Sequence, residues 1–222
     1  MPERVDQGNL WIAHALFDLG GIQFGDFTLG QTAVNSPVYV NPRVLLTQPL
    51  HLGRVAQIIQ REVQAGQARR RPRYERFSLV AGVPFGGLLL AIAYALQTDT
   101  SLVYAHPARS GDKVHSVEGR LVEGDHVLIL DDLMTGGTSI LRTAELLEEH
   151  NLEVSDAIVL IDREEGGVER LRQRGYHVTS LLTLRQMLTY YHETSLIEKD
   201  AFRRSMEYLE RSGGERAAES LG

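Results

Sequence analysis

Between residues 77 and 182, short apolar runs alternate with segments in which apolar side chains recur at helical spacing. The expected strands cover 77–82, 101–105, 127–130, 157–161 and 178–182, and the expected helices cover 87–96, 139–150 and 168–174. Strands that are apolar throughout and separated by helices are typical of a parallel sheet covered on both faces. The chain is therefore predicted to have an α/β fold that binds its ligands at the carboxyl ends of the strands.

The residues before this alternation are predicted to form a smaller, irregular unit. Apolar spacing predicts helices over 10–19 and 50–63, a hairpin over 22–29 that turns at Gly25-Asp26, and a strand over 36–40. The stretch 67–76 is polar and rich in arginine. It is interpreted as a solvated connecting loop, with a phosphate-binding patch as the alternative.

The C-terminal residues are predicted to form an extension of the main domain. Beyond residue 197 we expect a helix to about residue 209, followed by a mobile tail over 212–222. The predicted division is thus one domain over 1–197 and a C-terminal helix and tail over 198–222.

Composition and charge exclude several classes of partner. With 43% hydrophobic residues, the 222-residue chain can bury a sizeable core. Its net charge of −6 does not attract polyanions, so we expect no nucleic-acid partner. The longest apolar runs are far shorter than a membrane span, and residues 1–9 are polar, so we expect neither membrane attachment nor a signal peptide. The absence of cysteine rules out thiolate metal sites and suits a cytoplasmic location.

The segment VLILDDLMTGGTS, residues 127–139, carries the most specific chemical signal. An apolar strand runs into Asp131 and Asp132, and a loop of hydroxyl side chains and glycines then leads into a helix. Small residues let backbone N–H groups converge beside a helix N-terminus, which makes a cradle for an anion. The two carboxylates would repel a phosphate, so we expect them to face ribose hydroxyls or a hydrated Mg²⁺.

This segment has two other interpretations. The segment could be an ordinary strand-to-helix turn in which Ser or Thr caps the helix and the two Asp side chains lie on the surface. It does not match the GxxxxGK[ST] loop of nucleotide hydrolases, because it contains no lysine.

The same segment resembles the phosphoribosyl pyrophosphate (PRPP) signature of type I phosphoribosyltransferases. The resemblance implies that Asp131 and Asp132 hold the ribose hydroxyls and that the loop after them binds the 5′-phosphate. The implied PRPP-binding residues there are Asp131, Asp132, Leu133, Met134, Thr135, Gly136, Gly137, Thr138 and Ser139. It also implies a mostly parallel sheet flanked by helices, with a small N-terminal hood over about 1–45.

A second glycine-rich turn, residues 81–87, resembles the pyrophosphate loop of that family. The implied PRPP contacts in it are Val83, Pro84, Phe85 and Gly86. Taken alone, these glycines could equally serve close packing of a helix on a strand.

Residues 156–167, 24–29 and 36–41 resemble the matching parts of orotate phosphoribosyltransferases, in the same order along the chain. The resemblance implies that Arg163 and Thr135 bind orotate. A guanidinium can hold the orotate carboxylate through two charge-assisted hydrogen bonds. The alternative for Arg163 is a surface ion pair with Asp162 or Glu164. The resemblance further implies Mg²⁺ on the pyrophosphate, not held directly by the protein, and a homodimer that shares a mobile loop.

That mobile loop departs from the family pattern. The usual Arg-Lys pair falls on Ala105 and His106, and a later lysine falls on Arg109. Lysines found in some members are replaced here by Gly30 and Gly86. Arg109 and Lys113, together with loop histidines such as His115, are therefore the candidate catalytic cations beside Asp131 and Asp132. The alternatives are transfer to another base, or a PRPP- or nucleotide-sensing module without catalysis.

Overall fold

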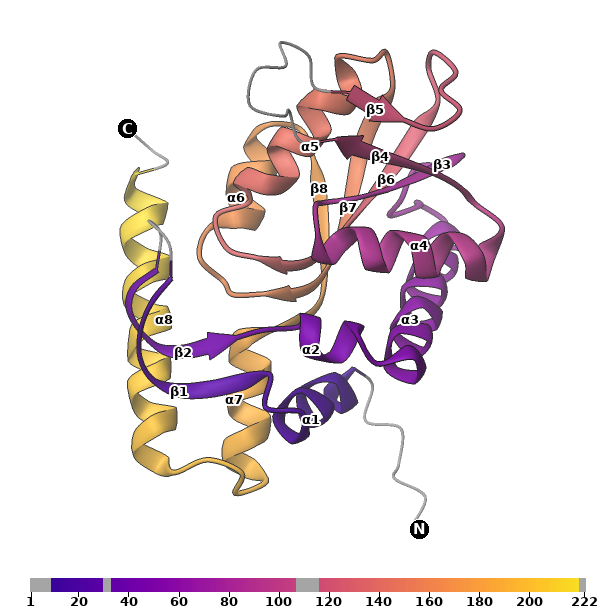
Figure 1. Ribbon diagram of the computed structural model, residues 1–222. Coiled ribbons are helices and arrows are strands. Elements are labelled where there is room, and N and C mark those ends of the chain that lie inside the picture. The colour runs from indigo at the N-terminus through magenta and orange to yellow at the C-terminus, as the bar shows by residue number, and fades with distance from the viewer. Residues whose placement is uncertain (1–8, 30–32, 107–115, 220–222) are drawn as a thin grey trace.

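The protein is described from a computed structural model, which covers residues 9–29, 33–106 and 116–219. Its centre is a six-stranded sheet in the order β5-β4-β3-β6-β7-β8 (Figure 1). The strands are β3 (Leu79–Gly82), β4 (Ser101–His106), β5 (Ser116–Glu118), β6 (His126–Met134), β7 (Glu153–Asp162) and β8 (His177–Thr183). All pairs are parallel except β4 with β5. The predicted α/β class and mostly parallel sheet are confirmed.

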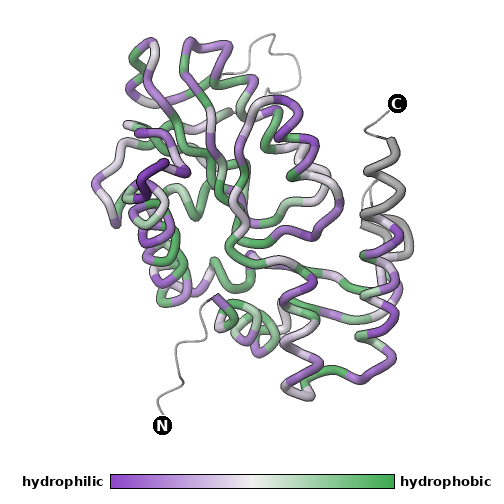
Figure 2. The backbone as a smooth tube through the Cα atoms, turned by 180° about the vertical axis from the view of Figure 1, so that it is seen from behind, coloured by the Kyte–Doolittle hydropathy of each residue, from purple (hydrophilic) through white to green (hydrophobic). Residues whose placement is uncertain are grey.

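Helices cover both faces of this sheet, which explains why its strands are continuous apolar runs. Val127 and Ile129 of β6 belong to a core shared with α5 (Thr138–Glu148) and α6 (Gly167–Gln173). Leu128 and Leu130 belong to a second core, shared with α3 (Pro49–Gln67) and α4 (Gly86–Thr98). Successive strand residues therefore alternate between two buried faces. Figure 2 shows these hydrophobic strands at the centre, with hydrophilic loops around them.

The N-terminal unit contains a two-stranded sheet of β1 (Ile22–Leu29) and β2 (Ala33–Val40), flanked by α1 (Leu10–Asp18) and α2 (Arg43–Leu46). The expected turn at Gly25-Asp26 is wrong, because both residues lie inside β1. Phe24 pairs with Val38 and Phe27 with Ser36, so β1 carries one extra residue there as a bulge. A glycine and an aspartate in a strand can mark such a bulge as well as a turn.

Two helices complete the N-terminal unit from the other end of the chain. They are α7 (Leu184–Glu193), which the sequence interpretation missed, and α8 (Lys199–Glu219), which packs on α7 and β2. Figure 1 shows α8 beside the β1–β2 sheet. The expected end of this helix at about residue 209 is wrong, because α8 continues to Glu219 and Ser212 is buried. The mobility expected for residues 212–222 stays a prediction. We use the word hood for α1, β1, β2 and α2.

The stretch 67–76 is a connecting loop at the amino ends of the strands, as predicted. Tyr74 anchors it: the ring is buried, and the hydroxyl donates to Glu62 Oε1 of α3 at 2.8 Å. Arg73 pairs with the same carboxylate at 2.9 Å. This loop therefore lies at the edge opposite to the carboxyl ends of the strands. Of the helices that the structure describes, none has the length and apolar character needed to cross a membrane.

Candidate active site

The two aspartates of the signature lie in β6, at the carboxyl edge of the sheet. The expected end of this strand at residue 130 is wrong, since β6 continues to Met134 and Asp131 pairs with Val159 of β7. Asp131 and Asp132 are only 5% and 6% exposed. The Asp132 N–H donates to Asp131 Oδ1 at 2.9 Å. The two carboxylates are therefore held in place by strand pairing and not by a flexible loop.

Burial raises the pKa of the Asp131 carboxyl well above its ordinary value, and the neighbouring Asp132 charge raises it further. The Asp132 N–H and the positive charge of Arg43 oppose this shift. A buried pair of acids is costly unless hydrogen-bond donors approach it. Such a pair suits a ligand rich in hydroxyl groups.

The phosphate loop follows the acids and ends at a helix N-terminus. Gly137 adopts the left-handed region with φ 74° as the residue before α5, a conformation that favours glycine. A side chain at Gly136 would meet nothing within 4 Å, so the backbone there faces open space. The first N–H groups of α5, from Thr138 onward, have no partner within the helix itself. This arrangement can hold an anion.

Helix α6 supports the phosphate loop from one side. A Cβ atom at Gly167 would lie 2.4 Å from the carbonyl oxygen of Thr135, so α6 and the loop are in close contact. Arg170 of α6 donates to Thr138 Oγ1 at 2.9 Å and to the Gly136 carbonyl at 3.5 Å. The sequence interpretation missed Arg170, because it lies 31 residues beyond the signature and in no motif of its own.

The glycines of residues 82–87 let the second loop approach β6. A Cβ atom at Gly87 would lie 2.3 Å from the Leu130 carbonyl oxygen, and one at Gly86 would lie 2.1 Å from Asp132 Oδ2. The Val83 N–H donates to the Leu130 carbonyl at 2.9 Å. The Pro84–Phe85 peptide bond is cis, and the Phe85 side chain is 71% exposed. The glycines thus allow α4 to pack closely on β6, and they also place the loop directly against Asp132.

Arg163 follows β7 and is 1% exposed. Its Nε donates to Glu165 Oε1 at 2.9 Å, its Nη2 to Ser36 Oγ at 3.1 Å, and its Nη1 to the Val38 carbonyl at 3.4 Å. The alternative of a surface ion pair with Asp162 or Glu164 is wrong. Glu164 instead pairs with Arg185 at 3.4 Å. Arg163 therefore joins the carboxyl edge of the sheet to the β2 strand of the hood.

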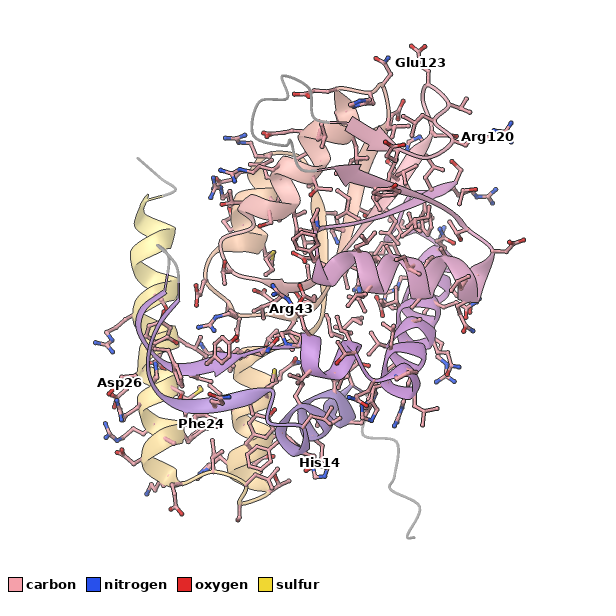
Figure 3. The ribbon with its side chains drawn as sticks, viewed as in Figure 1. His14, Phe24, Asp26, Arg43, Arg120 and Glu123 are labelled. Carbon is pink, nitrogen blue, oxygen red and sulfur yellow. The ribbon has the colours of Figure 1, made fainter. Side chains whose placement is uncertain are left out.

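Arg43 is a second hood contact that the sequence interpretation missed. It is the first residue of α2, and its Nε lies 3.6 Å from Asp132 Oδ2. Figure 3 shows Arg43 between the hood and the ends of the main strands. The sequence shows it only as an arginine two residues after Asn41, just beyond the segment 36–41 that resembles the family.

The chain is similar to proteins of known activity. A family model described as "Phosphoribosyl transferase domain" matches residues 45–177. The orotate phosphoribosyltransferase of Chlamydia caviae is 33% identical over 192 residues, covering 84% of this chain and 87% of that protein. This chain belongs to the orotate phosphoribosyltransferase family.

Two further relatives show how the match extends. The crystal structure of orotate phosphoribosyltransferase from Aeropyrum pernix has 34% sequence identity and a TM-score of 0.70, and the match covers 82% of this chain and 98% of that one. The uridine 5′-monophosphate synthase of Bos taurus is 30% identical over 196 residues, 88% of this chain. The chain spans 39% of the length of that synthase.

The departure from the family pattern that is expected from the sequence falls mainly on residues outside the described ranges. Arg109, Lys113 and His115 of the expected mobile loop, and Gly30 of the hood, lie outside the described residues. The structure describes the backbone of β4 up to His106, where the loop begins. The proposed roles of Arg109 and Lys113 stay predictions.

Proposed function

We propose that this protein transfers ribose 5-phosphate from PRPP to orotate, giving orotidine 5′-monophosphate and pyrophosphate. The observation that carries the proposal is the meeting of three features at one sheet edge. These are the buried pair Asp131 and Asp132, the phosphate loop at the start of α5, and the glycine loop that touches Asp132. Each matches one part of PRPP: the ribose hydroxyls, the 5′-phosphate and the pyrophosphate.

In the proposed reaction, a ring nitrogen of orotate forms a bond to the anomeric carbon of the ribose. The bond from that carbon to the pyrophosphate oxygen breaks, and pyrophosphate leaves with the electron pair while the orotate nitrogen loses its proton. The protein forms no covalent bond in this scheme. Its contribution is to align the two reactants, exclude water and stabilise the charge of the departing group. Arg109 and Lys113 are the proposed cations for that group.

Arg163 and Thr135 are the proposed contacts for orotate. Thr135 follows β6 and Arg163 follows β7, and the Arg163 N–H donates to the Met134 carbonyl at 2.9 Å. The two residues are therefore held next to each other at the carboxyl edge. Three of the five N–H donors of a guanidinium are used by Glu165, Ser36 and Val38. The proposal requires the others to reach the orotate carboxylate when the base binds.

Mg²⁺ is proposed to reach the site on the pyrophosphate of PRPP, where it would neutralise oxygen charge. Asp131 and Asp132 offer carboxylate oxygens that can accept hydrogen bonds from the waters of a hydrated Mg²⁺, without coordinating the metal directly. The Asp132 carboxylate lies against the loop proposed to take the pyrophosphate. We expect chelation of Mg²⁺ to abolish turnover and its return to restore it.

The proposal is tested by incubating the protein with PRPP, Mg²⁺ and orotate and following the ultraviolet absorbance of orotate. We expect the absorbance to fall and orotidine 5′-monophosphate to form. Uracil, adenine and hypoxanthine serve as alternative bases in parallel reactions. Arg163→Ala should remove activity with orotate. Tight PRPP binding with turnover of another base, or of none, would overturn the choice of orotate.

We also propose that two copies associate and that the loop over 107–115 of each reaches the site of its partner. The exposed apolar side chains of α4, Ile92 at 39% and Leu96 at 83%, offer a surface for association. The test mixes two inactive variants, Lys113→Ala and Asp132→Asn, under conditions that allow exchange of subunits. If the loop crosses between subunits, a mixed dimer contains one intact site and activity returns. No return of activity would place the loop and the acids in the same chain.

A further inference from the structure

Arg43 lies at the point where the hood faces the acidic pair. Its backbone is fixed as the first residue of α2, and its N–H donates to Asn41 Oδ1 at 3.2 Å. Its side chain is 65% exposed, yet Nε is 3.6 Å from Asp132 Oδ2, in a carboxylate that is 8% exposed. An exposed cation thus meets a buried anion.

The oxygen that Arg43 contacts is also the oxygen that faces the glycine loop. A Cβ atom at Gly86 would lie 2.1 Å from Asp132 Oδ2. Arg43 therefore lies beside residues 83–87, the turn from β3 into α4 that is proposed to take the pyrophosphate. The phosphate loop is held by a different arginine, Arg170, through Thr138. Arg43 and Arg170 therefore lie at different parts of the site: Arg43 beside the loop proposed for the pyrophosphate, and Arg170 beside the loop proposed for the 5′-phosphate.

Arg43 supplies positive charge where the pyrophosphate group is proposed to bind. The pyrophosphate of PRPP carries several negative charges, and the buried pair Asp131 and Asp132 repels it. Residues 83–87 contain no basic side chain. A guanidinium is well suited to bind phosphate oxygens in pairs.

A purely structural role explains the contact poorly. Ion pairs with a largely exposed partner contribute only about 0–1 kcal/mol to stability. The hood is already attached by Arg163, whose guanidinium is buried against Ser36 and Val38. Arg43 adds little to that attachment.

We propose that Arg43 is a PRPP-binding residue that leaves Asp132 for the pyrophosphate group when the ribose hydroxyls take its place at the carboxylate. The proposal rests on the function proposed above. Arg43 becomes a cation that the hood supplies to the pyrophosphate, in place of the basic side chain that residues 83–87 lack. It touches the leaving group but transfers no proton.

The test compares two ligands that differ by the pyrophosphate, PRPP and ribose 5-phosphate, by calorimetry without orotate. Arg43→Gln should weaken PRPP binding by about 10-fold or more, the effect of one lost charge-assisted contact. Binding of ribose 5-phosphate should change less than about 3-fold, and Arg43→Lys should recover part of the PRPP affinity. Arg203→Gln is the matched control, because Arg203 is 57% exposed and paired with acids on α8.

The possible results separate this proposal from the one on which it rests. If Arg43→Gln weakens both ligands equally, or neither, Arg43 does not bind the pyrophosphate and the proposal is overturned. If the wild-type protein binds neither ligand, the proposed function fails as well. If the wild-type protein binds PRPP without transferring orotate, the choice of base fails while the Arg43 comparison still decides its own question.

Discussion

Gly86 shows how one missing side chain shapes the site. A Cβ atom there would lie 2.1 Å from the short, buried Asp132 carboxylate, a distance at which something must move. We therefore expect Gly86→Ala to displace Asp132 and raise the KM for PRPP by about 10-fold or more, since charge-assisted contacts of about 1.5–3 kcal/mol are lost. The measurement is initial-rate kinetics with PRPP varied at saturating orotate.

Gly53 of α3 is the matched control for this substitution. A Cβ atom there meets nothing within 4 Å, so Gly53→Ala should leave the KM unchanged. It should also raise the free energy of unfolding by about 0.5–1 kcal/mol, as expected for alanine in place of glycine inside a helix. An unchanged KM for PRPP in Gly86→Ala would show that Asp132 is not the ribose contact.

The buried carboxyl of Asp162 should make the stability of the protein depend on pH. Burial raises the pKa of its carboxyl from 3.8 to about 6. The charge of Glu164 raises this pKa further, and the hydrogen bond from the Glu164 N–H lowers it. Because the folded state holds this proton more tightly, stability falls as the pH rises from about 4 to about 6. Asp162→Asn should remove that fall and add at most about 3 kcal/mol at pH 7.

The measurement for Asp162 is urea unfolding of wild type and variant at several pH values between 4 and 7. The difference between the two proteins isolates this carboxyl from the other acids. Asp200→Asn, at a surface site of α8, is the control and should follow the wild-type curve. A variant that is less stable than wild type at pH 7 would contradict the prediction.

At the scale of elements, the contact between α6 and the phosphate loop gives the next prediction. Arg170 holds the Thr138 hydroxyl at 2.9 Å, at the start of α5. Arg170→Ala should free that hydroxyl and remove a positive charge near the 5′-phosphate, so we expect the KM for PRPP to rise about 3- to 10-fold with kcat nearly unchanged. Binding of ribose 5-phosphate should weaken in parallel, in contrast to the effect expected at Arg43.

The control for Arg170 lies on the same helix. Arg172 is exposed and pairs with Glu169 at 2.8 Å, so it does not use its charge on the phosphate loop. Arg172→Ala should bind PRPP and ribose 5-phosphate as the wild type does. Equal behaviour of the two variants would mean that Arg170 has no part in binding the phosphate.

The central strands β3, β6 and β7 could be predicted from the sequence because most of their residues are buried on both faces. The short edge strand β5 was not predicted. A run such as 127–130 has no other stable place than the middle of a covered sheet. The end of β6 could not be predicted, because Asp131 and Asp132 read as loop residues until the pairing with β7 is known. The bulge at Gly25-Asp26 could not be predicted either, because turns and bulges use the same residue types.

Only part of the candidate site could likewise be predicted from the sequence. Loops that are continuous in sequence, such as 135–139, could be predicted from local chemistry and from the resemblance. Contacts between distant segments could not: Arg43 lies 89 residues before Asp132, and Arg163 meets Ser36 across 127 residues. Nothing in the local pattern of Arg43 distinguishes it from a solvated arginine, since its partner is set by the docking of the hood.

At the scale of the whole molecule, the site lies between the main sheet and the hood. The sheet supplies the acids and both loops, and the hood supplies Arg43 and the Ser36 contact to Arg163. Helix α8 packs on β2 and α7, and Arg204 of α8 pairs with Asp26 of β1 at 2.6 Å. The C-terminal helix therefore supports the part of the molecule that carries Arg43, although it contributes no residue to the described site.

The predicted division at residue 197 can be tested through the core of α8. Leu209 is 1% exposed and belongs to the same apolar core as Leu16 of α1 and Leu188 of α7. Leu209→Ala should lower the free energy of unfolding by about 2–4 kcal/mol, the usual cost of a cavity left by a buried leucine. Glu210→Ala, one residue further on an exposed face, should change it by less than about 0.5 kcal/mol. Urea unfolding followed by circular dichroism and by Trp11 fluorescence should give one shared transition. Two separate transitions, or a Leu209→Ala variant as stable as wild type, would show that α8 is an appendage and not a part of the fold.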